Sequence, residues 1–259
     1  MRHVARVAAL VLLSALALQL YFLARVGLMT VVDPQSTSFQ RSEAWRLVGE
    51  KHTLLWSQQW VDYGRIAPSL KRAVIASEDA GFAEHSGVEW DALEKAWERN
   101  QRAEARVEKI NEQLDKRLPK GGAGKPSASK PAARAQPKVV GGSTITQQLA
   151  KNLFLGGERS LLRKGQEFAI TFMLEACLSK QRILEIYLNN VEWGEGVFGA
   201  EAAARHYFHV GASGLGTMPA AQLAVMLPAP KRFEKRPGSA YVIGRAGTVS
   251  ARMGAVELP

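Results

Sequence analysis

The chain has 259 residues, enough for one or two domains with a buried core, and 46% of its residues are hydrophobic. Its single cysteine excludes an internal disulfide, and no group of Cys and His residues has the spacing of a zinc site. The formal net charge is +10, so the partners to consider are acidic: nucleic acid, a membrane surface or a phosphorylated substrate.

The first 32 residues predict a membrane anchor. Residues 7–23 are apolar except for Ser14 and Gln19, and residues 24–32 extend the stretch. The total exceeds the roughly 20 residues that cross a bilayer. No small-residue cleavage signal directly follows the apolar run, which favours a retained anchor over a cleaved signal peptide.

Two arginines, Arg2 and Arg6, precede the apolar run. Positive residues tend to stay in the cytoplasm, so we expect a cytoplasmic N-terminus and the rest of the chain outside. Asp33-Pro34 marks the exit from the membrane, and residues 33–259 are expected to form the folded domain.

Apolar and small residues recur with helical spacing along most of the remaining chain. The segments with this pattern are 68–79, 90–114, 145–153, 168–178, 180–190, 200–208 and 219–227. No run of alternating polar and apolar residues of any length is present. The fold is therefore predicted to be all-α.

The stretch from Gly141 to Leu153 contains the strongest candidate binding motif. Its two glycines let the backbone turn, and Ser143 or Thr144 can cap the helix that follows. Gln148, Lys151 and Asn152 then lie on nearby faces of that helix, at spacings of three and four. Donors and a cation at a helix N-terminus suit an anion such as phosphate. The alternative is an ordinary capped amphipathic helix.

Two adjacent carboxylates, Glu78 and Asp79, end an apolar helix, and Phe82 and His85 follow them. A carboxylate against an apolar surface has a raised pKa, because burial disfavours its charged form. Proteins make a general acid or base from glutamate in this way. The alternative is a solvated helix end.

A basic group follows the central stretch. It consists of Arg159, Arg163 and Lys164, with Glu167 four residues after Arg163. The functional interpretation is a cationic rim for a phosphate-bearing substrate. The alternative is a helical salt bridge.

Most of the net charge lies in one segment, residues 102–138 and the few residues before it. Eleven Lys and Arg face four Asp and Glu between Arg99 and Lys138, which leaves +7 of the total +10. The part from Lys120 to Lys138 is rich in Pro, Gly, Ala, Ser and Lys, and this composition predicts a flexible insert. The basic charge therefore says little about the folded domain and does not favour nucleic acid as a partner.

Together, these segments resemble the glycosyltransferase module that polymerises peptidoglycan in class A penicillin-binding proteins and in monofunctional biosynthetic peptidoglycan transglycosylases. The family motif Glu-Asp-x-x-Phe-x-x-His-x-Gly matches residues 78–87, and Gly-Gly-Ser-Thr-Ile-Thr-Gln-Gln-x-x-Lys-Asn matches residues 141–152. The motif Arg-Lys-x-x-Glu matches residues 163–167. Further matches follow in the family's order at 182–189, 196–208 and 227–230.

The resemblance implies a lysozyme-like all-α domain with an N-terminal transmembrane helix. It also implies the substrates, lipid II and the growing glycan chain, and an inverting transfer that releases undecaprenyl diphosphate. Glu78 matches the family's general base, and Glu167 matches the second glutamate, which assists departure or positions the diphosphate. The substrate-binding candidates are Asp79, Phe82, His85, Ser143, Thr144, Gln148, Lys151, Asn152, Arg159, Arg163 and Lys164.

The resemblance also gives expectations about surroundings. The protein would sit in a bacterial inner membrane with its catalytic domain in the periplasm, where other cell-wall synthesis proteins are potential partners. No dedicated metal site is indicated, although Mg²⁺ or Mn²⁺ at the diphosphate is associated with some members. The insert at 102–138 departs from the family, and we hypothesise that it alters membrane contact or processivity.

Two other functions remain as alternatives. A lysozyme-like lytic transglycosylase would need an acid in a cleft but no cationic donor site, so the Lys151, Arg159 and Arg163 group argues against it. A non-enzymatic, membrane-tethered basic module would have its charge spread over the folded domain, whereas most of the charge lies in the insert.

Overall fold

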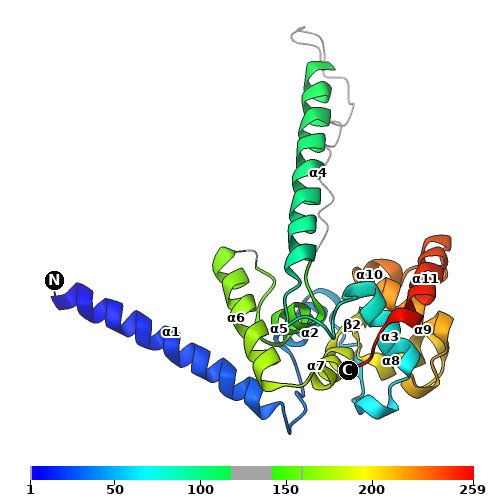
Figure 1. The fold of residues 1–259 in the computed structure, drawn as a ribbon, viewed down its shortest axis with the longest axis horizontal. Coiled ribbons are helices and arrows are strands. Elements are labelled where there is room, and N and C mark those ends of the chain that lie inside the picture. Colours follow the sequence, from blue (N-terminus) through cyan, green and yellow to red (C-terminus); the bar gives the residue numbers. More distant parts are fainter. Residues whose placement is uncertain (1, 118–141, 159) are drawn as a thin grey trace. The chain divides into compact units, whose positions relative to one another are not determined.

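A computed structural model describes residues 2–117, 142–158 and 160–259. Its α-helices are, in chain order, α1 Arg2–Leu28, α2 Ser38–Lys51, α3 Pro68–Glu78, α4 Trp90–Arg117, α5 Ile145–Phe154, α6 Leu161–Cys177, α7 Lys180–Asn190, α8 Ala200–Phe208, α9 Thr217–Met226, α10 Pro230–Phe233 and α11 Ala240–Arg252 (Figure 1). Short 3₁₀ turns lie at Tyr63–Arg65, Ala212–Gly214 and Met253–Ala255.

The prediction of an all-α fold is confirmed, with one small sheet added. Strands β1 Ser57–Gln58, β2 Glu192–Gly194 and β3 Val197–Phe198 form it in the order β1-β3-β2. β1 is parallel to β3 and pairs Ser57 with Val197, whereas β2 is antiparallel to β3. Strands of two or three residues are too short to produce an alternating pattern that sequence could reveal.

The chain forms two compact units, residues 1–88 with 144–259, and residues 89–143. The second unit contains α4, which continues the predicted helix at 90–114 to Arg117. Residues 102–117, the first part of the predicted insert, are therefore helical. The segment at 120–138 that we predicted to be flexible lies outside the described residues.

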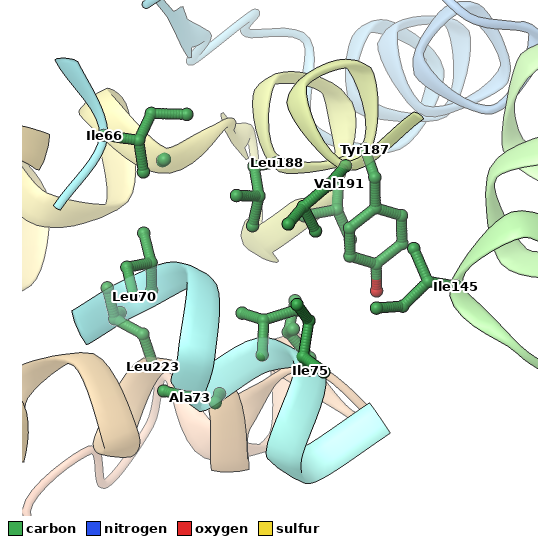
Figure 2. Packing of buried hydrophobic residues seen from close by; sticks show 14 of the residues in the cluster. Ile66, Leu70, Ala73, Ile75, Ile145, Tyr187, Leu188, Val191 and Leu223 are labelled. Carbon is green, nitrogen blue, oxygen red and sulfur yellow. The ribbon is translucent and has the colours of Figure 1, made fainter. Parts of the chain in front are cut away.

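The core of the first unit lies between α3, α7, α9 and α11. In α3, Leu70, Ala73 and Val74 share one face and are fully buried. Every residue of α7 from Ile183 to Leu188 except Glu185 is buried, so this helix is central to the core. Figure 2 shows side chains of α7 meeting those of α3 and the ring of Tyr187 beside Ile145 of α5. This packing places the ends of α3 and α5 next to each other.

Helix α1 is long and apolar enough to cross a membrane, and only 6% of its most apolar window is buried. Its last turns contact the folded domain. Phe22 lies edge-on to Phe154 of α5 with ring centroids 5.3 Å apart, and Val26 is fully buried. The Arg182 guanidinium of α7 donates to the Met29 carbonyl at 2.8 Å. The end of α1 is thus part of the core.

A pair of side-chain amides joins α1 to α6. Gln19 Nε2 donates to Gln166 Oε1 at 2.7 Å, and Gln166 Nε2 donates back to Gln19 Oε1 at 3.0 Å. Such reciprocal bonds satisfy two polar groups that would otherwise be costly on an apolar helix face.

We expect Gln19→Leu and Gln166→Leu each to lower the free energy of unfolding in detergent micelles by about 1 kcal/mol, because each leaves one amide unpaired. The double variant should lose less free energy of unfolding than the two single variants lose together, and the difference, the coupling energy, should be about 0.6–1.7 kcal/mol. Denaturant unfolding of the four proteins measures this. Gln19→Leu combined with Gln101→Leu, an exposed position of α4, is the control and should be additive. Additivity in the test pair would contradict a direct contact.

Candidate active site

The site begins where α3 ends. Pro68 occupies the first turn of this helix, a position suited to proline, and Glu78 is the last helical residue. Asp79 follows as the C-cap, with its backbone N–H bonded to the Ile75 carbonyl. The two carboxylates that the sequence singled out therefore stand at a helix end, as predicted, but not in solvent.

The Asp79 carboxylate is 4% exposed, and both of its oxygens are bonded. Oδ1 lies 2.7 Å from His85 Nε2, and Oδ2 accepts from the backbone N–H of Ile145 at 2.9 Å. A buried carboxylate is tolerable only with such donors. Asp79 thereby attaches the end of α3 to the start of α5.

The ring of His85 is fixed by its own neighbours. The Gly87 N–H donates to His85 Nδ1 at 3.1 Å, so Nδ1 is the acceptor and Nε2 carries the proton toward Asp79. Gly87 has φ +86°, and a Cβ there would come within 2.8 Å of Glu175 and Thr171 side-chain carbons. The glycine is therefore required on two grounds, conformation and space.

Glu78 receives a hydrogen bond from α5. Gln148 Nε2 donates to Glu78 Oε2 at 3.0 Å, and the Tyr187 hydroxyl donates to Gln148 Oε1 at 2.9 Å. The tyrosine thus orients the amide so that its NH₂ group faces Glu78. Burial raises the pKa of the Tyr187 hydroxyl well above its ordinary value, so it remains a donor.

The pKa of Glu78 is raised above its ordinary 4.5. Burial of the carboxyl is the main cause, and the neighbouring negative charge of Asp79 adds to it. The hydrogen bond from Gln148 acts in the opposite direction because it favours the charged form. The sequence-based prediction of a carboxyl with a raised pKa is confirmed for Glu78.

A pocket of about 290 Å³ lies at the other end of α5. Its lining consists of Phe39, Lys151, Asn152, Leu155, Gly156, Gly157 and Arg163. Lys151 is one helical turn beyond Gln148, so α5 presents the amide that binds Glu78 and the pocket's lysine on successive turns. Desolvation lowers the pKa of Lys151, and the cations Arg163 and Lys164 lower it further, whereas Glu167 raises it.

Helix α6 supplies the second cation of the pocket. Glu167 is 3% exposed and pairs with both Arg163, at 3.2 Å, and Lys164. Arg163 Nε is buried and has no hydrogen-bond partner among the described residues. Because Arg163 also lines the pocket, its guanidinium suits an anionic ligand there.

The N-terminus of α5 is different from our expectation. We predicted that its amides would receive a phosphate, but protein groups already occupy those of Thr144, Ile145 and Gln147. Asp79 accepts from Ile145, Thr144 Oγ1 accepts from the Gln147 N–H, and the Gln147 side chain accepts from the Thr144 N–H. The anion at this helix N-terminus is the Asp79 carboxylate. The pocket lined by Lys151 and Arg163 lies at the C-terminal end of α5 instead.

The comparisons with known proteins show the family of the chain. A family model described as Transglycosylase matches residues 50–120 and 124–254. The biosynthetic peptidoglycan transglycosylase of Burkholderia pseudomallei (strain K96243) is 49% identical over 244 residues, which cover 94% of this chain and 83% of the relative. The chain belongs to the transglycosylase family. The protein of the same name from Paraburkholderia phytofirmans is 46% identical over 252 residues, 97% of this chain and 91% of the relative. No finding supports the lytic enzyme or the non-enzymatic module.

The structure brings together most of the residues that the sequence marked in this transglycosylase. Glu78, Asp79, Phe82, His85, Thr144 and Gln148 meet where α3 ends and α5 begins, while Lys151, Asn152, Arg163, Lys164 and Glu167 lie at or beside the pocket. Ser143 belongs to the second unit, so its place relative to this site stays a prediction. Arg159 lies outside the described residues.

Sequence reasoning did not identify several residues of the site. Tyr187 lies in the segment 180–190, which the sequence predicted only to be a helix, and its hydroxyl contact with Gln148 spans 39 residues of sequence. Thr146 donates to Glu175 at 2.6 Å, and Lys180 pairs with the same carboxylate at 2.9 Å. Phe39 of α2 had no distinguishing pattern. Only the glycine pair Gly156-Gly157, directly after a helix, carried a signal that could have marked the pocket.

Glu78→Gln should stabilise this transglycosylase at neutral pH by about 1 kcal/mol, because it removes a buried charge. A raised folded-state pKa means that the carboxyl contributes stability below its unfolded pKa and loses it as the pH rises through the folded value. The extra free energy of unfolding of Glu78→Gln over the wild type should therefore shrink as the pH falls toward 4.5. Urea unfolding at several pH values tests this, with exposed Glu84→Gln as the control. A gain independent of pH would refute the assignment.

Proposed function

We propose that this transglycosylase polymerises lipid II into linear glycan strands. One observation carries the proposal. Two features lie on the short helix α5: Gln148 contacts Glu78, whose pKa is raised, and Lys151 lines a cationic pocket. The first suits proton removal from a sugar hydroxyl, and the second suits a leaving diphosphate. The relatives' name, biosynthetic peptidoglycan transglycosylase, supports the same reaction.

Glu78 acts as the general base. Its carboxylate takes the proton from the 4-hydroxyl of the acceptor sugar as that oxygen attacks the anomeric carbon of the donor. The new bond forms as the bond from that carbon to the diphosphate breaks, and the electron pair leaves with the diphosphate. Attack opposite the leaving group inverts the anomeric carbon and gives a β-1,4 linkage. The raised pKa makes Glu78 a stronger base than a solvated glutamate.

Lys151 and Arg163 bind the diphosphate and stabilise the charge that develops as it leaves. Arg163 offers the unsatisfied Nε donor, and Asn152 adds an amide at the pocket wall. Glu167 does not reach the substrate in this proposal. Its two oxygens hold Arg163 and Lys164, so it is a positioning residue for the cations.

Asp79, Phe82, His85 and Thr144 are buried or bonded to the protein, which favours a positioning role over direct contact with substrate. Asp79 joins α3 to α5, and Thr144 Oγ1 donates to the Gly87 carbonyl at 2.6 Å. Together they hold Glu78 next to Gln148. A contact of these four residues with lipid II remains a prediction of the resemblance.

The pocket lining does not form a dedicated divalent metal site. Among its side chains only that of Asn152 has an oxygen, whereas Mg²⁺ and Mn²⁺ prefer several oxygen ligands. The nearby Glu167 carboxylate is already paired with two cations. We derive no catalytic step through a metal.

Helix α1 supports a membrane location for the protein. Arg2 and Arg6 support a cytoplasmic N-terminus in the bacterial inner membrane, with the catalytic domain on the periplasmic side. Lipid II is lipid-linked, so an enzyme anchored by one helix meets its substrate at the bilayer surface. Other cell-wall synthesis proteins remain candidate partners.

Glu78→Gln should lower the rate of glycan formation from labelled lipid II by a factor of about 10²–10⁴, because the amide cannot accept the proton. Glu84→Gln, an exposed glutamate in the segment after α3, should leave the rate unchanged. In the wild type, the rate should rise with pH above 4.5 until Glu78 is fully ionised. Equal rates for both variants would reject Glu78 as the base.

Lys151→Gln and Arg163→Gln should each lower kcat/KM for lipid II by about 10²–10³, because both cations stabilise the departing charge. Arg72→Gln, which removes an exposed charge from α3, is the matched control. Single-turnover kinetics with labelled lipid II separate binding from chemistry. A loss of affinity alone would show that the pocket holds the substrate without assisting departure.

A further inference from the structure

A second pocket, distinct from the one described above, lies where α1 ends. It measures about 480 Å³ and is lined by Arg25, Leu28, Met29, Val32, Asp33, Pro34, Gln35, Ser36 and Arg41. It shares no lining residue with the pocket on α5. We propose that it binds the phosphate head group of an anionic glycerophospholipid of the surrounding bilayer.

The first argument is its depth in the membrane. About 20 residues at 1.5 Å each cross the hydrocarbon core, and counting from Val7, after the basic start, reaches Val26. Arg25 and Leu28 therefore lie at the outer boundary of the hydrocarbon, next to the head-group layer that contains the phospholipid phosphates. A pocket at this level is open to bilayer lipid.

The second argument is the chemistry of the lining. Arg25 and Arg41 are both exposed, and among the described residues neither pairs with a carboxylate. Arg41 is held in place by bonds to Ser36 Oγ and Ser38 Oγ, each 3.0 Å long. Arg25 donates to the Tyr21 hydroxyl at 3.1 Å. Two preorganised guanidinium groups at one pocket suit one phosphate.

Asp33, the one acidic residue in the pocket lining, does not prevent an anion from binding. Asp33 is paired with Arg182 at 2.7 Å, and Arg182 also pairs with Glu185 at the same distance. This pairing offsets part of the Asp33 charge and fixes the chain that forms the pocket wall. The pocket therefore offers net positive charge from Arg25 and Arg41.

The apolar lining favours a lipid over free phosphate. Leu28 and Val32 are exposed, and Leu28 continues the apolar surface of α1 that faces the hydrocarbon. An acyl chain can follow this surface while the head group meets the arginines. Bilayer phospholipid is also present at very high local concentration, so even modest affinity fills the site by mass action.

Native mass spectrometry of the full chain in detergent micelles, titrated with dioleoyl-phosphatidylglycerol or dioleoyl-phosphatidylcholine, tests the proposal. We expect one phosphatidylglycerol to be retained in preference to phosphatidylcholine. Arg25→Gln and Arg41→Gln should each weaken that binding about fivefold. Arg245→Gln, the same charge change at an exposed site on α11, should not alter it. Arg41→Lys should retain more affinity for phosphatidylglycerol than Arg41→Gln, because lysine keeps the positive charge although it lacks the paired N–H donors of the guanidinium group.

Equal retention of the two lipids, or an equal loss in Arg245→Gln, would overturn the proposal. A competition with undecaprenyl diphosphate identifies the occupant. If the diphosphate displaces phosphatidylglycerol and Arg41→Gln abolishes this effect, the site holds the lipid diphosphate and the proposal is wrong. If Lys151→Gln weakens diphosphate binding and leaves phosphatidylglycerol bound, the two pockets hold different lipids, as proposed. Arg25 lies on an exposed helix face, so its variant should fold even if Arg41→Gln does not.

Discussion

The buried carboxylate of Asp79 is the contact on which the rest of the site depends. It accepts from Ile145 at the first residue of α5 and meets His85, so three separate segments converge on one side chain. Gln148 lies one turn further along α5, and Glu78 is the residue before Asp79. Their hydrogen bond is therefore a consequence of how Asp79 joins the two helices. Burying a carboxylate without hydrogen-bond donors is costly. Arrangements of α3 and α5 that leave the Asp79 carboxylate buried without them are therefore strongly disfavoured.

Two glutamates of the site have opposite surroundings. Glu78 is partly buried beside another carboxylate, which raises its pKa, and its neighbours give it only neutral hydrogen bonds. Glu167 is held between two cations. Environments of this kind separate the roles of two identical side chains. Glu78 is suited to accept a proton, whereas Glu167 is suited to keep Arg163 and Lys164 in place.

The sequence predicted most of the helices between α3 and α9, because periodicity is a local property, but it did not identify α2, α10 or α11 and placed the start of α6 at residue 168 instead of Leu161. The α7 and α8 bounds matched the predicted ranges, and the apolar residues Ile183, Ile186 and Tyr187 of α7 are buried. It could not show that the α5 amides are occupied, since Asp79 lies 66 residues before Ile145. The contact of Tyr187 with Gln148 also joins residues far apart in the sequence, so no local pattern could reveal it. A capping pattern predicts where a helix starts, but only the fold decides which group satisfies its free donors.

The position of the pocket on α5, where we propose that the diphosphate binds, relative to α1 suits a substrate that never leaves the bilayer. The end of α5 that carries Lys151 also carries Phe154, which packs against Phe22 of α1. Arg182 fixes the chain just beyond α1 through the Met29 carbonyl and Asp33. A polyprenyl chain can therefore remain in the hydrocarbon beside α1 while its diphosphate occupies the pocket. On this view the anchor is a structural part of the donor site, because it sets the depth at which the diphosphate meets its cations.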